Sequence, residues 1–415
     1  MELLRFATAG SVDDGKSTLI GRLLHDTKSL LDDTIEAVEI STARRGGTGL
    51  DLALITDGLR AEREQGITID VAYRYFATAK RSFVIADTPG HVQYTRNMVT
   101  GASNSDLAII LIDARHGLKE QSFRHASIAS LLGIGQLVFA INKMDLVGWS
   151  SDRFHEIEVD IKNLAIRLGL SDWVTIPLSA LSGGNVVDRS EDTPWYAGPT
   201  LLQHLEEVPI RLAASTIGGR LAVQWIIRPS SNDHTSVHDP TTARRWYCGP
   251  QSGGPFAVGD EIVVLPSGTR STVTEVVGNG AATRIQLADE RDISRGDLIA
   301  HAHRQPTLTN QFRAMVCSMV DEPLACGSRV LIKHGTRTTP AVVESVEVRV
   351  DITTGVEDTG LSSLGLNEVG RVRFRTAQPL ALDDYRANRA TGAFIAMHPT
   401  TNATLLAGMV QLEAD

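Results

Sequence analysis

The stretch Gly10-Ser11-Val12-Asp13-Asp14-Gly15-Lys16-Ser17-Thr18 lies between a short apolar run and a helical pattern. It matches GxxxxGK[ST], a loop whose glycines let backbone N–H groups wrap a polyphosphate at the positive end of a helix. In such a loop Lys16 reaches the β and γ phosphates and the Ser17 hydroxyl binds Mg²⁺. The pattern therefore predicts a site for a nucleoside triphosphate, although the same letters taken alone also fit a glycine-rich turn.

A second motif, Asp87-Thr88-Pro89-Gly90-His91, closes the apolar run FVIAD. Asp87 at the end of a strand can hold magnesium through a water molecule, and the Gly90 N–H can meet the γ phosphate. His91 directly follows this Asp-x-x-Gly motif, at the position where many GTPases carry a glutamine that orients the attacking water. A neutral imidazole can do the same. The alternative is a histidine that packs at the edge of the sheet.

Between these two motifs, a long loop ends in EREQGITID, residues 62–70. Thr68 is the candidate for a second hydroxyl on magnesium, engaged only when the γ phosphate is present. A threonine that simply begins a strand is the alternative. A loop of the first kind would be ordered by the triphosphate and released after hydrolysis, which is how a nucleotide controls a partner.

Two further segments carry features that select a base. They are Asn142-Lys143-Met144-Asp145, after the run QLVFAI, and Ser179-Ala180-Leu181, after WVTIP. The acceptor-only carboxylate of Asp145 suits the N1–H and amino group of guanine, whereas adenine offers no such pair of donors. Asn142 can tie its loop to the phosphate loop, the stem of Lys143 can cover the base, and the Ala180 N–H would face the guanine O6. Five motifs in this order, each at a strand end, predict a GTP site.

The order of elements predicts the fold. Short β-rich runs alternate with helical stretches over the first 208 residues, which is typical of a mostly parallel sheet covered by helices. From about Arg220 the runs are short and β-rich, with turn residues between them, as in small β-barrels. For this chain of 415 residues we predict an α/β P-loop domain over 1–208, a first β-barrel over 219–304 and a second β-barrel over 305–415.

The composition is that of a folded protein, with 42% hydrophobic residues, 21% charged residues and a formal charge of −9. The longest apolar runs are far shorter than a membrane span, and the N-terminus lacks a signal-peptide pattern, so we expect a cytoplasmic protein. Without a basic segment we expect no nucleic-acid partner. Three cysteines without a CxxC pair argue against a disulfide framework, and His301 with His303 lacks a third ligand for zinc.

These motifs resemble the translation-factor class of GTPases, in which a GTP-binding domain precedes two β-barrels. Elongation factors usually show VDHGK[ST] at the phosphate loop, whereas this chain has Asp14 in place of the histidine. Three stretches resemble instead the GTPase subunit of the bacterial heterodimeric sulfate adenylyltransferase. They are TAGSVDDGKSTLIGRLLHDTKSL, TDGLRAEREQGITIDVAYRYF and DTPGHVQYTRNMVTGASNSDLAIILIDARHG. The likeness is dense from Leu4 to about Val147 and looser through both barrels.

The resemblance implies a specific coupling. In that family a separate small subunit transfers AMP from ATP to sulfate, and GTP hydrolysis by the large subunit drives this very unfavourable reaction. Nucleotide state and partner state must then share one conformational equilibrium. We expect that linkage to begin in the segments 62–70 and 87–98. Some relatives continue into an adenylylsulfate kinase, but no second GxxxxGK[ST] occurs here, so kinase activity is not expected.

Two other readings fit parts of the sequence. One is a translation factor that binds aminoacyl-tRNA, against which Asp14 and the stretches ERE and NMVTGAS argue. The other is a scaffold that binds GTP without turnover, which a measurement of phosphate release would separate from an enzyme. We expect a Mg²⁺-dependent GTPase that binds GTP and GDP and works with the small adenylyl-transferring subunit.

Overall fold

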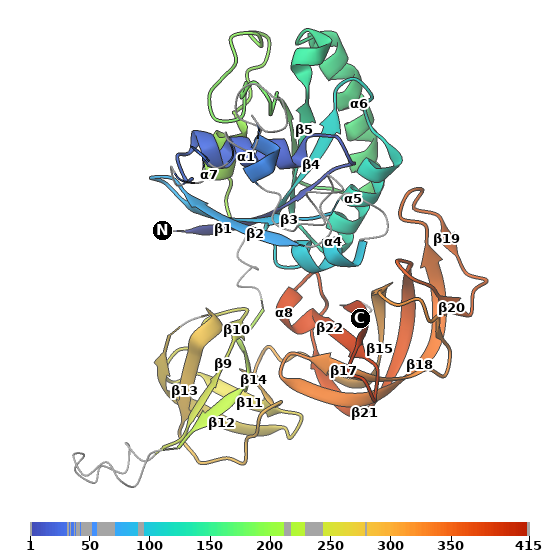
Figure 1. The fold of residues 1–415 in the computed structure, drawn as a ribbon. Helices are drawn as coiled ribbons and strands as arrows, with labels where there is room; N and C mark the ends of the chain where they lie inside the picture. The colour runs from blue at the N-terminus through green and yellow to red at the C-terminus, as the bar shows by residue number, and fades with distance from the viewer. Residues whose placement is uncertain are drawn as a thin grey trace. The chain divides into compact units, whose positions relative to one another are not determined.

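The computed structural model describes residues 2–30, 52–55, 71–89, 95–210, 217–228, 244–278 and 280–412, with five isolated positions between 33 and 42. Two compact units can be told apart within these ranges, one built on residues 1–211 with 352–354 and the other on residues 212–351 and 355–415. Figure 1 labels the elements of both units.

The first unit is built on a six-stranded sheet in the order β2-β3-β1-β4-β5-β6. The strands are β1 (Leu3–Ala9), β2 (Ala72–Ala77), β3 (Ser82–Asp87), β4 (Leu107–Asp113), β5 (Gln136–Asn142) and β6 (Trp173–Pro177). All neighbours are parallel except β2, which runs antiparallel to β3. Every residue of β4 and β5 is buried, as expected for central strands covered on both faces.

Helices lie on both faces of this sheet (Figure 1). They are α1 (Lys16–Asp26), α4 (Thr95–Ala102), α5 (Glu120–Leu131), α6 (Ser151–Leu168) and α7 (Leu201–Glu207), with short 3-10 turns at η1 (Leu52–Ile55) and η3 (Met144–Val147). Local signals fix the ends of α6: the Ser150 side chain accepts a hydrogen bond from the Arg153 N–H, and Gly169 ends the helix at φ +63°. The buried Arg81 side chain donates to two carbonyls at the end of α7, those of Leu205 and Val208.

The second unit contains two all-β sheets, of which the first has eight short strands. They are β7 (Arg220–Ala222), β8 (Trp225–Ile227), β9 (Trp246–Gly249), β10 (Gln251–Ser252), β11 (Glu261–Leu265), β12 (Thr269–Val277), β13 (Thr283–Leu287) and β14 (Leu298–His301), with the 3-10 turn η4 (Gly280–Ala282). β7 runs on into β8, and β9 runs on into β10, with only one or two residues between the members of each pair. The segment β7–β8 pairs on one side with β14 and on the other with β9–β10, which closes the sheet on itself. Alternate strand residues such as Leu221, Ile262 and Ile285 fill the interior.

The second sheet is a closed barrel, since β17 pairs with both β22 and β18. Its elements are β15 (Thr307–Ser318), β17 (Arg329–His334), β18 (Arg337–Val350), β19 (Glu357–Asp358), β21 (Val369–Leu382), β22 (Ala393–Met397), β23 (Thr404–Gln411) and the short helix α8 (Arg389–Gly392). The strands β16 (Leu324–Ala325) and β20 (Ser363–Leu364) form a separate pair. Phe312, Phe374 and Phe394 meet in the interior with ring centroids 5.4 to 5.7 Å apart. The chain thus has an α/β P-loop domain followed by two small β-barrels.

A buried ion pair joins the two barrels. The Arg220 guanidinium donates to both carboxylate oxygens of Asp383 at 3.0 Å, and the Thr391 hydroxyl donates to the same carboxylate. The Arg220 side chain is only 2% exposed. Because burial removes both charges from water, each depends on the other for its compensation.

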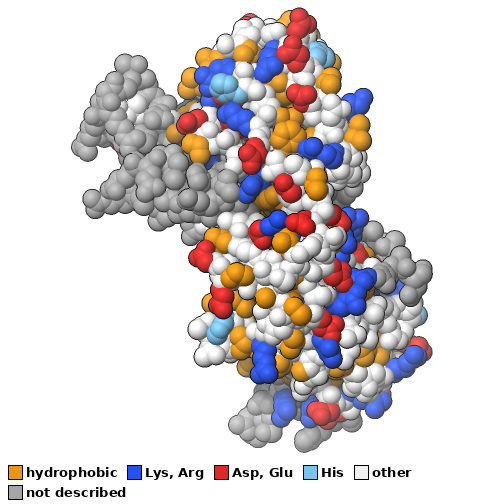
Figure 2. All heavy atoms as spheres, turned by 90° about the vertical axis from the view of Figure 1, so that its right-hand side faces the viewer, with side chains coloured by type: hydrophobic (Ala, Val, Ile, Leu, Met, Phe, Trp, Pro, Cys, Tyr) orange, Lys and Arg blue, Asp and Glu red, His pale blue; other side chains and the backbone are white. Residues whose placement is uncertain are grey.

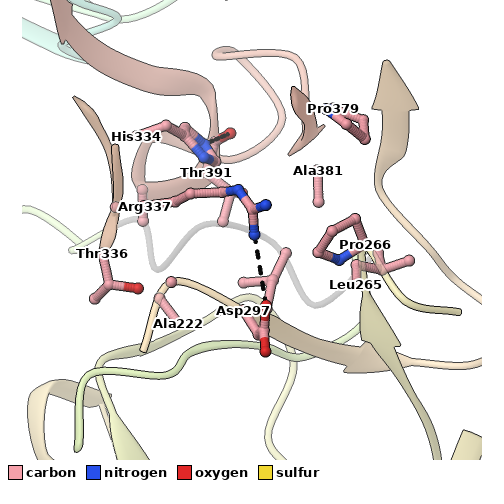
Figure 3. Close-up of a pocket in the computed structure, with 14 residues that line it drawn as sticks. Ala222, Leu265, Pro266, Asp297, His334, Thr336, Arg337, Pro379, Ala381 and Thr391 are labelled. Atoms are coloured by element: carbon pink, nitrogen blue, oxygen red, sulfur yellow. Dashed lines mark hydrogen bonds and ion pairs between the residues drawn. The ribbon is translucent and has the colours of Figure 1, made fainter. Parts of the chain in front are cut away.

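Beside this pair lies a small cavity, shown in Figure 3. Arg337 reaches across it toward Asp297, with 3.5 Å between guanidinium nitrogen and carboxylate oxygen, and also donates to Gln378. The His334 ring nitrogen Nε2 donates to the Thr391 carbonyl in the same wall. The cavity measures about 30 Å³, which is room for one or two water molecules rather than a substrate.

Charged side chains on the outer face of the second barrel compensate one another. Arg313 on β15 and Arg373 on β21 stand opposite each other, and both contact the Glu347 carboxylate on β18, at 3.0 and 2.9 Å. The acid removes the repulsion between the two cross-strand arginines.

Figure 2 shows basic and acidic side chains interspersed over one face of the molecule. Among the residues described, no helix is both long enough and apolar enough to cross a bilayer.

We expect Arg220→Leu to lower the free energy of unfolding of the second unit by about 3–5 kcal/mol, because Asp383 would remain buried without its cation. Equilibrium denaturation in urea, followed by circular dichroism, would measure the change. The matched control is Arg375→Leu, which breaks the ion pair of a 62% exposed arginine with Glu344 and should cost less than about 1 kcal/mol. Equal losses in the two variants would contradict the role given to the buried pair.

Candidate GTP site

The predicted site segments meet at one edge of the first unit's sheet. Gly10 follows β1, Asp87 ends β3, Asn142 ends β5 and Ser179 follows β6. These strands are parallel, so their carboxyl ends lie along the same edge, where open α/β sheets bind ligands. The structure therefore brings the described parts of the phosphate motifs and the base motifs together.

The phosphate loop runs from Gly10 into the start of α1 at Lys16. Gly15 adopts φ +91°, and a Cβ atom at this position would clash with the side-chain amide nitrogen of Asn142. Both observations explain why a glycine stands here. The Ser11 N–H donates to the Asp14 carboxylate at 2.8 Å, which closes the turn of the loop.

Lys16 connects the phosphate loop to the end of β3. Its ammonium group lies 2.7 Å from an Asp87 carboxylate oxygen and also donates to the Thr88 carbonyl. Both side chains of the ion pair are at most 8% exposed. The Thr88 hydroxyl in turn donates to the Thr8 carbonyl on β1, so the two strand ends are fixed to each other.

Asn142 connects the phosphate loop to the two base loops, as we call the segments Asn142–Asp145 and Ser179–Leu181 that are predicted to bind the base. Its Nδ2 donates to the Asp14 carbonyl at 2.7 Å, as the sequence predicted for a tie between these loops. Its Oδ1 accepts from the Lys143 N–H at 2.8 Å and from the Ala180 N–H at 2.9 Å. The Ala180 N–H, which we expected to face the guanine O6, thus already has a partner in this structure.

Lys143 contacts charged groups behind the loop. Its ammonium group lies 2.9 Å from Asp113, at the end of β4, and also donates to the Asp13 carbonyl. Arg115 donates to the same Asp113 carboxylate at 2.7 Å. Burial by itself raises the pKa of Asp113, but the hydrogen bonds from Arg115 and Lys143 outweigh burial and lower the pKa below its usual range. Asp113 therefore stays ionised and anchors Lys143.

Asp145 has the feature expected of a base-binding acid. Its Oδ1 is buried and has no hydrogen-bond partner among the described residues. A buried acceptor left in this state costs free energy, which a donor from a ligand would recover. The guanine N1–H and amino group are donors of the required kind.

Several residues of this network were not found from the sequence. Arg22 on α1 donates to the carbonyls of Ala180 and Leu181 and so supports the second base loop, where Leu181 itself is 70% exposed. Lys119, just before α5, lies 3.5 Å from the Asp14 carboxylate. Asp113 was also missed. Its position at the end of β4, beside the other motifs, was the one signal in the sequence that could have indicated it.

His125 on α5 is a buried histidine close to the site. Its Nδ1 has no hydrogen-bond partner among the described residues, and the side chain is almost completely buried. Burial, together with the positive charge of Lys16, lowers the pKa of His125 to about 3. The ring is therefore neutral at neutral pH.

Three predicted site residues, Thr68, Gly90 and His91, lie outside the described residues. The described magnesium candidates are the Ser17 hydroxyl at the start of α1 and the buried Asp87 carboxylate at the end of β3. Mg²⁺ prefers hard oxygen ligands of these kinds, so the donor set fits the ion.

His301, set aside as a zinc ligand, accepts from the Gly219 N–H through Nδ1 and bonds Asp260 through Nε2.

Comparison with known families agrees with this fold. Residues 1–213 match the family described as elongation factor Tu GTP binding domain, and residues 311–411 match the GTP-eEF1A C-terminal domain-like family. The GTPase-like domain of Ski7 from S. cerevisiae, bound to GDP and inorganic phosphate, is similar over 99% of this chain and 98% of its own, with a TM-score of 0.53. At 15% sequence identity that likeness concerns the fold alone.

Fold and site together define a GTPase of the translation-factor superfamily, with a GTP-binding domain and two barrels. The chain is 50% identical over 420 residues to "Sulfate adenylyltransferase subunit 1" of Saccharophagus degradans, covering 99% of this chain and 87% of the relative. It is 53% identical over 418 residues to "Bifunctional enzyme CysN/CysC" of Mycobacterium tuberculosis (strain ATCC 25618 / H37Rv), covering 98% of this chain and 67% of that relative. The chain belongs to the sulfate adenylyltransferase subunit 1 family.

We expect Asp145→Asn to weaken GTP binding on the order of a hundredfold, because the loss affects two charge-assisted hydrogen bonds. The same variant should gain affinity for xanthosine triphosphate, since an amide can donate to the carbonyl that replaces the amino group of guanine. Isothermal titration calorimetry with both nucleotides would measure the exchange. Asp152→Asn, which removes an exposed acid on α6, is the matched control. Unchanged preference for GTP would remove Asp145 from base recognition.

Proposed function

We propose that this chain is the GTP-hydrolysing subunit of a cytoplasmic sulfate adenylyltransferase heterodimer. In this function, hydrolysis of GTP drives the transfer of AMP from ATP to sulfate, which a separate small subunit performs. The observation that carries the proposal is the family membership, at 50% identity over 99% of the chain, together with a GTP site whose Asp145 Oδ1 awaits a donor. We assign the three parts to 1–208, 219–304 and 305–415.

The phosphate end of the site needs no protein nucleophile. Positioning and charge stabilisation carry phosphoryl transfer, and Lys16 supplies a buried positive charge for this purpose. Mg²⁺, when bound, would neutralise phosphate charge, with Ser17, Thr68 and Asp87 as the residues that would hold it. His91 would orient the attacking water.

The base end accounts for specificity. Asp145 accepts from the two guanine donors, and the chain of bonds through Asn142 keeps this loop at a fixed distance from the phosphate loop. ATP lacks the matching donors, so the GTP site and the ATP-dependent reaction of the partner use different nucleotides. Separate nucleotides allow one reaction to drive the other without competition for a single pocket.

The decisive experiment combines the full chain with the small adenylyl-transferring subunit. Formation of adenosine 5′-phosphosulfate should require GTP, and a GTP analogue that resists hydrolysis should not replace it. A complex that forms the product equally well without GTP would contradict the coupling. Retention of aminoacyl-tRNA by the chain in a GTP-dependent manner, with no effect on sulfate activation, would favour the translation-factor reading.

We expect His91→Ala to lower the rate of phosphate release on the order of a hundredfold, with little change in GTP affinity, because the imidazole would act on the attacking water and not on the bound nucleotide. Single-turnover measurement of phosphate release, alongside a titration of GTP binding, separates the two quantities. His155→Ala, on the exposed side of α6, serves as the control. An unchanged rate would exclude His91 from the mechanism.

A further inference from the structure

Asp14 is a buried acid inside the loop predicted to hold phosphate. It is 1% exposed, and one of its carboxylate oxygens accepts from the Ser11 N–H. Its own carbonyl accepts from Asn142. The side chain is therefore fixed within the loop and cannot turn toward solvent without breaking the turn.

A carboxylate in this place opposes the binding of an anion. The loop presents backbone N–H groups to phosphates, and a like charge among them repels the ligand. Burial raises the pKa of Asp14, while the Ser11 N–H and Lys119 act in the opposite direction. The negative charge of Asp14 is thus costly in the free protein and more costly beside a polyphosphate.

Lys119 is the cation that the structure places against this acid. Its ammonium group lies 3.5 Å from the second Asp14 carboxylate oxygen, and its side chain is 37% exposed. The Lys119 backbone N–H bonds the Ser122 hydroxyl in the first turn of α5, which fixes the residue at the start of that helix. One end of the ion pair is therefore buried in the phosphate loop, and the other is open to solvent.

We propose that Lys119 is a positioning residue that sets the affinity for guanine nucleotides by neutralising Asp14. The inference rests on the proposed GTPase function, since it concerns the same phosphate loop. When Lys119 faces Asp14, its positive charge offsets the repulsion between the Asp14 carboxylate and the nucleotide. When Lys119 is drawn away, the buried carboxylate repels the phosphates and the nucleotide is released more readily. Lys119 acts through Asp14 and not through contact with the reacting atoms.

A double-mutant cycle tests this coupling in the full chain, with the dissociation constant for GDP measured by isothermal titration calorimetry. Lys119→Met should raise the constant about tenfold, because the Asp14 charge loses its partner. Asp14→Asn keeps an oxygen that accepts from the Ser11 N–H and should lower the constant. In the Asp14→Asn background, Lys119→Met should change the constant by less than about twofold.

Matched variants separate charge from fold. Lys162→Met removes an exposed lysine from α6 of the same unit and should leave the constant unchanged. Lys119→Arg keeps the charge and should bind GDP nearly as tightly as the wild type. A general structural role of Lys119 would weaken binding equally in both Asp14 backgrounds, and that result, or no effect of Lys119→Met, would overturn the proposal.

The measurement also distinguishes this inference from the proposed function. A wild-type chain that bound no GDP would overturn the GTP site and the inference together. GDP constants that follow the expected cycle, in a chain whose sulfate activation does not depend on GTP, would overturn the coupling to sulfate activation alone.

Discussion

The GTP site depends on the hydrogen bonds of one buried side chain, Asn142. Through Nδ2 it holds the phosphate loop at the Asp14 carbonyl, and through Oδ1 it holds the N–H groups of Lys143 and Ala180. These partners belong to the loops after β1, β5 and β6. Because a buried amide that loses a partner costs free energy, the three loops keep their spacing. A ligand that extends from a polyphosphate to a base binds more tightly when this spacing is fixed beforehand, because the loops then lose little conformational entropy on binding.

The sequence was sufficient to predict the fold class and to find the segments that the structure brings together at one edge of the sheet, whose roles in binding phosphate and base stay predictions. GxxxxGK[ST] and the Asn142 motif each follow an apolar strand, and the carboxyl ends of parallel strands meet at one edge whatever the rest of the chain does. The bond from Asn142 to the phosphate loop was predicted on the same ground. The roles of Thr68 and His91 remain predictions, since both residues lie outside the described part of the chain.

The ion pairs that support these motifs or join the two barrels could not be predicted. Lys119 and Asp14 are 105 residues apart, and Arg220 and Asp383 are 163 residues apart. Predicting an ion pair of this kind requires knowledge of which loops and barrels approach one another. No local sequence pattern carries that information. Arg22 illustrates the same limit, because its position on α1 gives no sign that it bonds the carbonyls of the loop at Ala180.

Two buried acids, one inside the phosphate loop and one behind it, differ in how well their charges are compensated. Asp113 receives hydrogen bonds from Arg115 and Lys143, and its pKa is lowered by them in spite of burial. Asp14 has one backbone donor and a lysine at 3.5 Å, and burial raises its pKa. The less compensated acid is the one inside the loop. On the role proposed for Lys119, small movements of the segment that carries it would change the binding energy of the nucleotide more than equal movements near Arg115. A partner that displaced this segment would change nucleotide affinity, and the nucleotide would change the affinity for that partner by the same factor. Such reciprocity is what the proposed coupling of GTP hydrolysis to another subunit's reaction would require.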